Sequence, residues 1–328
     1  MNFFAYREPE ENETHIFQAD KAMSLPSGTP TIDGFILSPF DSKASHIHFY
    51  PYIKKLDKIP QQLSYGDEAD APHHGSGDYE DYVSRAIEEI KKGGCKKIVT
   101  ADSKVVSCVK PPARLFKVLC GLYPRAFVFL FSTEEFGVWI GATPELLLQR
   151  RGNRLSTMAL AGTRPASEEN RPWDEKNVEE QRWVSQHILE VLERNGCAPV
   201  AEEPRTQRAG NIEHIMTPIT AQCSDGMDII RVLRKLSPTP ALCGTPPDQA
   251  MAFIKKNEGD RALYGGFAGP HLRNGDFQLY VLIRCARLQK DKAQLFAGGG
   301  VTSLSIPLEE KIEIERKYDT LQSIFFDE

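Results

Sequence analysis

Two apolar runs separated by only four residues place the strongest constraint on the fold. Residues 126–132 and 137–142 have the β-branched and aromatic content of strands, and Thr133-Glu134-Glu135-Phe136 lies between them. A connection this short joins antiparallel strands, because parallel neighbours need a crossover of a dozen or more residues. A third strand is expected at 154–161. The pattern therefore favours antiparallel pairing.

Helical patterns flank these strands. Apolar residues recur at helical spacing in six segments, which are 78–92, 113–122, 174–196, 227–236, 247–255 and 308–325. Asp78 is the expected cap of the first helix, and Gly93-Gly94 ends it. Further strands are expected at 97–100, with a return around 105–106, and at 277–286 and 293–297.

These elements predict an α+β fold, a single large domain of antiparallel β-sheets packed together with helices outside. Residues 1–75 are expected to be a variable N-terminal part of the same domain, and 76–328 its remainder. With 328 residues, 41% hydrophobic and 26% charged, the chain has ample material for a buried core, which excludes a mainly disordered protein.

The sequence gives no sign of a membrane or nucleic-acid partner. Apolar runs stay well short of the roughly 20 residues that span a bilayer, and the N-terminus lacks the order of a secretory signal. We therefore expect a cytoplasmic protein. The net charge of −5 arises from 40 basic and 45 acidic residues that are not concentrated in a tail. We expect a monomer or a weak dimer.

The seven cysteines are scattered without a C-x-x-C pair, so buried free thiols are expected rather than a zinc site or disulfides. Because the protein is acidic overall, binding an anion would require local cations or a bound metal.

Two charged residues stand where burial is expected. Lys97 opens an apolar strand, and Glu145 lies within an apolar segment at 139–148. Burial lowers the pKa of a lysine and raises that of a glutamate, which suits such a pair to proton transfer near neutral pH. Solvated residues at strand ends are the alternative. Lys96 competes with Lys97, but strand alternation lets only one face a given side.

Carboxylates recur in two of the expected helices. Glu179 and Glu180 lie in the long helix, whereas Glu310, Glu313 and Lys317 share one face of the last helix. The alternatives are a solvated acidic face and a Mg²⁺ site, since Mg²⁺ takes oxygen ligands and needs only one or two protein carboxylates.

Arg284 and a run of glycines suggest an anion site. Arg284 interrupts an apolar strand and needs a partner such as a carboxylate. Gly298-Gly299-Gly300 ends the next expected strand and would let backbone N–H groups approach an anion, although such a run is usually a simple turn.

Together these segments resemble the chorismate-using enzymes, closest to isochorismate synthase. The resemblance covers residues 78–325. Its marks, in family order, are Lys97-Ile98-Val99-Thr100, Gly141 to Leu148, Leu160 to Pro165, Glu175 to Gln181, Ser237 to Gly244, Ile283 to Ala286, Phe296 to Val301, and the set Glu310, Glu313 and Lys317. The resemblance implies that 76–328 is a chorismate-binding catalytic region.

The resemblance also implies roles. Lys97 would activate water for attack at C2 of chorismate, and Glu145 would protonate the departing C4 hydroxyl. Glu180 and Glu313 would bind Mg²⁺ directly, with Glu310 and Asn177 in its water-mediated shell. The residues implied to bind the substrate are Arg284, Lys317, Gly298, Gly300, Gly162, Thr163, His214, Ala241 and Leu242.

The resemblance favours the branch of the family that uses water. Anthranilate synthases usually carry glutamine where Lys97 stands, and aminodeoxychorismate synthases typically carry lysine where Ala161 stands. The expected function is therefore isochorismate synthase, serving menaquinone or siderophore synthesis. Salicylate synthase is the alternative. Less favoured alternatives are anthranilate or aminodeoxychorismate synthase component I and a non-catalytic chorismate-binding relative.

Overall fold

The computed structural model describes residues 1–41, 46–65, 79–168, 171–209, 212–224, 226–322 and 324–325. Their strands are β1 (Asn2–Arg7), β2 (His15–Ala19), β3 (Met23–Ser24), β4 (Gly34–Ser38), β5 (His48–Lys55), β6 (Lys97–Ser107), β7 (Phe127–Thr133), β8 (Gly137–Thr143), β9 (Leu146–Arg151), β10 (Arg154–Pro165), β11 (Ala198–Ala201), β12 (Arg205–Ala209), β13 (Ile212–Gln222), β14 (Gly244–Thr245), β15 (Phe267–His271), β16 (Phe277–Val281), β17 (Cys285–Leu288) and β18 (Lys292–Val301).

Each pairing between these strands is antiparallel, as predicted. The order is β14-β6-β18-β17-β8-β7-β1-β2-β5-β4-β15-β16-β9-β10-β13, with β3 also on β5, and with β11 and β12 on β13. The short connection between β7 and β8 forms the expected hairpin. The prediction of antiparallel sheets in an α+β fold is confirmed.

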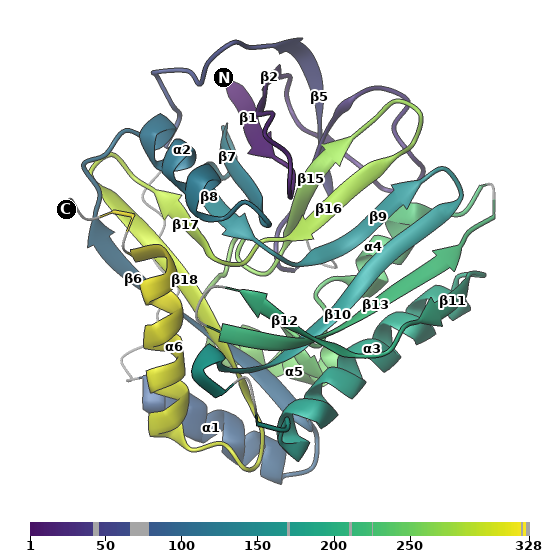
Figure 1. Ribbon diagram of the computed structural model, residues 1–328, viewed down its shortest axis with the longest axis vertical. Coiled ribbons are helices and arrows are strands. Elements are labelled where there is room, and N and C mark those ends of the chain that lie inside the picture. The colour runs from purple at the N-terminus through teal and green to yellow at the C-terminus, as the bar shows by residue number, and fades with distance from the viewer. Residues whose placement is uncertain are drawn as a thin grey trace.

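Helices cover the outside of this sheet (Figure 1). They are α1 (Tyr79–Lys91), α2 (Pro112–Leu122), α3 (Glu175–Arg194), α4 (Ile229–Leu236), α5 (Pro247–Asn257) and α6 (Pro307–Gln322), with a short 3₁₀ turn at Ala166–Glu168. The α1 and α6 helices lie beside β6 and β18, whereas α3 runs along β10, β11 and β13. The expected cap residue Asp78 lies outside the described residues.

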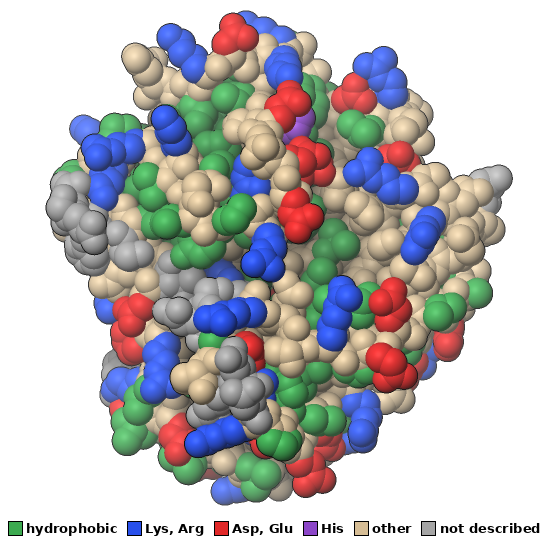
Figure 2. Space-filling model, viewed as in Figure 1, with side chains coloured by type: hydrophobic (Ala, Val, Ile, Leu, Met, Phe, Trp, Pro, Cys, Tyr) green, Lys and Arg blue, Asp and Glu red, His purple; other side chains and the backbone are tan. Residues whose placement is uncertain are grey.

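The N-terminal part contributes β1 to β5 to the same sheet. The β1 strand lies between β2 and β7, and β4 pairs with β15, so early strands alternate with later ones. A boundary near residue 75 remains a prediction. Figure 2 shows one face of the molecule, on which Lys and Arg side chains are interspersed with Asp and Glu side chains. None of the described helices is both long and apolar enough to cross a membrane.

Three strand predictions were wrong in detail. The apolar run 277–286 is two strands, because Arg284 has a positive φ of 49° and turns the chain from β16 to β17. The β6 strand continues through Asp102 and Ser103, where a turn was expected, because its partner β18 pairs with it along its whole length. For the same reason Gly298 and Gly300 lie within β18 and not beyond its end.

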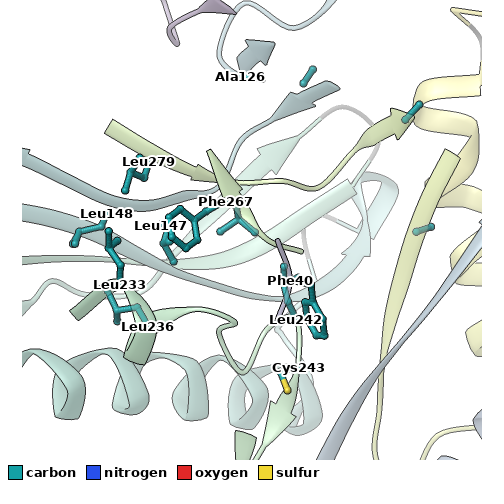
Figure 3. Close-up of a cluster of buried hydrophobic side chains, with 14 of the residues drawn as sticks. Phe40, Ala126, Leu147, Leu148, Leu233, Leu236, Leu242, Cys243, Phe267 and Leu279 are labelled. Carbon is teal, nitrogen blue, oxygen red and sulfur yellow. The ribbon is translucent and has the colours of Figure 1, made fainter. Parts of the chain in front are cut away.

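The core consists of two clusters of buried apolar side chains. Figure 3 shows Phe40 beside Leu242, and Leu147 beside Phe267, each pair brought together from distant parts of the chain. All seven cysteines are free thiols, six of them buried and Cys120 partly so, as expected.

Candidate active site

A cavity of about 380 Å³ lies between the β6–β18 pair and the β10–β13 pair, with the N-terminal part of α3 and one face of α6 at its rim. It brings together all but one of the residues predicted for the site, namely Lys97, Glu145, Gly162, Thr163, Asn177, Glu180, His214, Ala241, Leu242, Arg284, Gly298, Gly300, Glu313 and Lys317. The exception is Glu310, which is buried just behind the wall. Residues from separate motifs thus share one cavity.

Lys97 is the first residue of β6 and is only 3% exposed. Its Nζ donates to Glu180 Oε2 at 2.8 Å, forming a buried ion pair. The side chain lies flat over β18 because Gly300 has no Cβ, and an added Cβ there would lie 2.6 Å from Lys97 Cε. Lys96 points outward, with its Nζ 5.9 Å from the centroid of the Trp183 ring. Because successive strand residues point to opposite faces, Lys97 faces the cavity and Lys96 does not.

Glu145 lies between β8 and β9 and is 5% exposed. Its backbone carbonyl accepts from the Val281 N–H at 2.9 Å, which ties this short connection to β16. Burial raises the pKa of Glu145 to about 7, although Arg284 and Lys97 partly oppose the shift. A carboxyl group with this pKa holds its proton near neutral pH and can transfer it, as a general acid must.

Three carboxylates at the wall are each paired with a lysine. Besides Lys97 with Glu180, Lys317 Nζ lies 2.7 Å from Glu313 Oε1, and Lys176 Nζ lies 3.4 Å from Glu310 Oε1. Burial alone would raise the pKa of Glu313, but the charge and hydrogen bond of Lys317 lower it below its usual value. Burial raises the pKa of Glu310, with Lys176 opposing. Lys176 was not predicted from the sequence, although it lies four residues before Glu180 and hence on the same helix face.

Asn177 links the start of α3 to β10. Its backbone N–H donates to Asp174 Oδ1 at 2.8 Å, so that Asp174 caps the helix, and its side-chain amide donates to Asp174 Oδ2. Its Oδ1 accepts from the Thr163 N–H at 2.9 Å. The β10 ladder shifts register between Ala161 and Arg164, and Gly162 there has a φ of 73°. This irregularity turns the strand toward the cavity.

His214 on β13 and Arg284 form a polar corner. His214 Nδ1 lies 3.0 Å from the Gly162 carbonyl oxygen, to which it donates, and its Nε2 accepts from Arg284 Nη2 at 3.3 Å. Burial, together with the positive charge of Arg284, lowers the pKa of His214 to about 4. The ring is therefore neutral at pH 7, and Arg284 carries the positive charge of this corner.

A buried ion pair behind the cavity fixes part of its wall. Arg261 pairs with Glu258 and also donates to the carbonyl oxygens of Leu242 at 2.9 Å and Val99 at 2.7 Å. Glu258 Oε2 in turn accepts from the Tyr82 hydroxyl and from the Ala101 N–H. Val99 and Leu242 line the cavity. This pair was not predicted from the sequence, because neither residue stands in an apolar pattern.

The acidic side chains fit a divalent cation in their chemistry. Among the described residues, no group of three Asp, Glu, His or Cys side chains is already gathered as a metal site. However, Glu310 Oε2 is buried without a hydrogen-bond partner, and it would lie 3.4 Å from a Cβ at Gly299, as Glu180 Oε2 would from a Cβ at Gly300. Mg²⁺ requires few protein ligands, so these carboxylate oxygens suit it when one of the paired lysine ammonium groups moves away.

Comparison with known proteins identifies the family. The family described as "Chorismate binding enzyme" matches residues 48–326, most of the chain.

The chain belongs to the chorismate-binding enzyme family.

Relatives within the chorismate-binding enzyme family include enzymes of two kinds. Isochorismate synthase MenF of Haemophilus influenzae is 30% identical over 302 residues, which are 87% of this chain and 68% of the relative. Anthranilate synthase component 1 of Pseudomonas putida is 28% identical over 243 residues, which are 70% of this chain and 49% of the relative. The chain thus spans about half to two thirds of the length of these curated relatives.

A solved structure shares the fold of this chorismate-binding enzyme. It is described as a putative 2,3-dihydroxybenzoate-specific isochorismate synthase, DhbC, from Bacillus anthracis. The two superpose with a TM-score of 0.82 at 23% identity, covering 98% of this chain and 95% of the other.

Proposed function

We propose that the protein is an isochorismate synthase, which converts chorismate to isochorismate by adding water at C2 and removing the C4 hydroxyl. One observation carries the proposal: Glu145, with a pKa raised to about 7 by burial, lines the same cavity as the buried amine of Lys97. The reaction needs a base for the attacking water and an acid for the departing hydroxyl, and this pair provides both.

The protons balance between these two residues. Once Lys97 has released its ammonium proton to solvent, its neutral amine takes a proton from the attacking water as the water oxygen bonds to C2, and Glu145 gives a proton to the hydroxyl that leaves C4 as water. Arg284 and Lys317 would hold the substrate carboxylates, and neutral His214 keeps Arg284 in place through its Nε2. Bound Mg²⁺ would supply further positive charge for a substrate carboxylate, and Glu180 and Glu313, with Glu310 behind, would hold it.

Lys97 and Ala161 support the branch of the family that uses water. Ala161 is buried and lines the cavity, so the site offers no amine at this position. A vibriobactin-specific isochorismate synthase of Vibrio cholerae and the menaquinone-specific isochorismate synthase MenF of Escherichia coli are also similar to this chain, which supports either a siderophore or a menaquinone pathway for this protein. Salicylate synthase remains the second candidate, because elimination of pyruvate from isochorismate would use the same cavity.

Product analysis tests the proposal. Purified protein is incubated with chorismate and Mg²⁺, without ammonia or glutamine, and the products are separated by chromatography. We expect isochorismate alone, formed in amounts that fall to background with EDTA. Salicylate with pyruvate would assign the protein to the lyase branch. Anthranilate formed only when ammonia is added would overturn the use of water, and no product under either condition would favour a non-catalytic binding protein.

A further inference from the structure

The three lysine–carboxylate pairs make the wall of the cavity electrically balanced. Lys97 pairs with Glu180, Lys317 with Glu313, and Lys176 with Glu310. Each of these carboxylates thus has one cation already. A divalent cation that enters this cluster adds two positive charges beside three ammonium groups. Because like charges repel strongly in a poorly solvated cavity, entry requires one lysine to move away.

Two of the lysines are held firmly. The Lys97 side chain is 4% exposed and is enclosed between β6, β18 and α3, with a 2.8 Å contact to Glu180. The Lys317 ammonium has two partners, Glu313 Oε1 at 2.7 Å and the Gly298 carbonyl oxygen at 2.6 Å. Moving Lys97 would break a short hydrogen bond in a place that solvent hardly reaches, and moving Lys317 would break two short hydrogen bonds at once.

Lys176 is held less firmly. Its Nζ lies 3.4 Å from Glu310 Oε1, the longest of the three contacts, and its side chain is 36% exposed. It is the second residue of α3, where the helix dipole disfavours a positive charge. Although burial would lower the pKa of Lys176, the negative charges of Glu310, Glu180 and Glu313 raise it above its usual value. Lys176 therefore stays at the cavity because of these carboxylates.

Glu310 is only half satisfied by this arrangement. Its Oε1 meets Lys176, whereas its Oε2 is buried without a partner of good hydrogen-bond geometry, and the nearby Ser305 side chain offsets only part of the effect of burial on the pKa of Glu310. A buried carboxylate oxygen without a partner carries a large desolvation cost. The longest lysine contact and the oxygen without a well-formed hydrogen bond both belong to Glu310. A divalent cation would therefore stabilise Glu310 more than it would Glu180 or Glu313.

We propose that Lys176 is an exchangeable internal cation, which neutralises Glu310 while the cavity holds no metal and moves toward solvent when a divalent cation takes its place. Lys176 thereby competes with the metal and sets the metal concentration at which the site fills. The inference rests on the metal requirement in the proposed function and goes beyond it, since it assigns a role to a residue that neither binds the metal nor acts on the substrate.

Metal binding without substrate tests this role. Mg²⁺ is titrated calorimetrically into protein stripped with EDTA, at fixed ionic strength, for the wild type and for Lys176→Gln, Lys176→Arg and Lys311→Gln. Lys311 is the matched control, because it pairs with Glu80 at 2.7 Å, is 35% exposed, and lies outside the cavity. The melting temperature of each protein is measured with and without Mg²⁺.

We expect Lys176→Gln to bind Mg²⁺ about three- to tenfold more tightly than the wild type, as loss of one partly exposed competing charge allows. Its metal-free form should melt at a lower temperature, and Mg²⁺ should raise that temperature by more than in the wild type. Lys176→Arg and Lys311→Gln should bind as the wild type does.

Equal or weaker Mg²⁺ binding by Lys176→Gln, with normal binding by the wild type, would overturn the exchange while leaving the proposed function intact. Tighter binding by Lys311→Gln to the same degree would also overturn it, because the effect would then be one of overall charge. If the wild type binds no Mg²⁺ yet forms isochorismate, both this inference and the metal requirement are wrong. If it does neither, the proposed function itself is wrong.

Discussion

The amine of Lys97 lies 2.8 Å from a carboxylate oxygen of Glu180, and the two side chains are almost completely enclosed. They are 83 positions apart in the chain and belong to β6 and α3. The proposed base is thus hydrogen-bonded to a proposed metal ligand. Any cation that binds Glu180 must share this carboxylate with Lys97, so metal binding and the environment of the base are linked.

Replacement of Lys97 tests the proposed base. Lys97→Ala should lower kcat by about 10²- to 10⁴-fold, the usual contribution of a general base, while Mg²⁺ still binds. The measurement is the initial rate of isochorismate formation together with calorimetric Mg²⁺ binding. Lys96→Ala, at the exposed neighbouring position, is the control and should retain its rate. Normal turnover by Lys97→Ala would rule out this role.

Glu145 should impose a pH limit on the reaction. Because the pKa of Glu145 is raised to about 7, the acid form is lost as pH rises, and kcat/KM should fall above about pH 7. Glu145→Gln should lower kcat by about 10²- to 10⁴-fold. A wild-type profile that stays flat between pH 6 and 9 would contradict the assignment of Glu145 as the acid.

Glu145 should also leave a signature in stability. The folded protein binds a proton at Glu145 that the unfolded chain releases above about pH 4.5, so the free energy of unfolding falls as pH rises from about 4.5 to 7. Glutamine does not titrate, so Glu145→Gln should not lose stability in this way as pH rises. Relative to the wild type, it should gain up to about 3 kcal/mol between pH 4.5 and 8. Urea unfolding at several pH values measures the difference, and a constant difference would speak against a raised pKa.

Glu313 should be required for metal binding. Glu313→Gln keeps the shape of the side chain but removes its charge, so Mg²⁺ affinity should fall by roughly tenfold or more. Calorimetric titration measures this directly. Glu315→Gln, two positions along the same helix and outside the cavity, is the control. An unchanged Mg²⁺ requirement in Glu313→Gln would remove this residue from the metal site.

A methyl group on Gly300 should disturb the base without changing any charge. The new Cβ would lie 2.6 Å from Lys97 Cε, so Lys97 must shift, and Gly300→Ala should reduce kcat by up to about 10²-fold. Gly121→Ala in α2 is the control, because no atom lies within 4 Å of its added Cβ. Full activity of Gly300→Ala would show that catalysis does not depend on the exact position of Lys97.

Arg261 should matter for stability and for the shape of the cavity. Arg261→Met leaves Glu258 buried without its charged partner, which typically costs about 3–5 kcal/mol. Arg273→Met removes an exposed pair with Asp33 and should leave the unfolding free energy nearly unchanged. Denaturant unfolding compares the two. If both variants unfold at the same denaturant concentration, the buried pair has no special role.

Much of the fold could be predicted from local pattern. The β7–β8 hairpin and the long α3 helix follow from periodicity and short connections. The break at Arg284 could not be predicted, because a single charged residue between two apolar stretches is equally compatible with one continuous strand. Likewise the glycines of β18 resemble a turn in sequence. They lie within a strand because β18 pairs with β6 along its whole length, and the close approach of Lys97 explains why Gly300 has no side chain.

The candidate site was predictable to the extent that motifs mark it. Family motifs pointed to Lys97, Glu145 and Arg284, and the structure places all three in one cavity. Lys176 was missed because a lysine near a helix start resembles a solvated residue. Its importance depends on Glu310, which lies 134 positions later and reaches it only in the folded protein.

The pairing of β6 with β18 has a consequence for how the protein is made. Thr100 and Gly299 are neighbours across these strands although 199 positions separate them. During synthesis, β6 must therefore wait for almost the whole chain before its partner emerges, and contacts of such separation slow folding. One edge of the strand that carries Lys97 therefore stays unpaired until β18 leaves the ribosome, as an edge of β4 does until β15 emerges, so this protein is expected to depend on protection of its nascent strand edges.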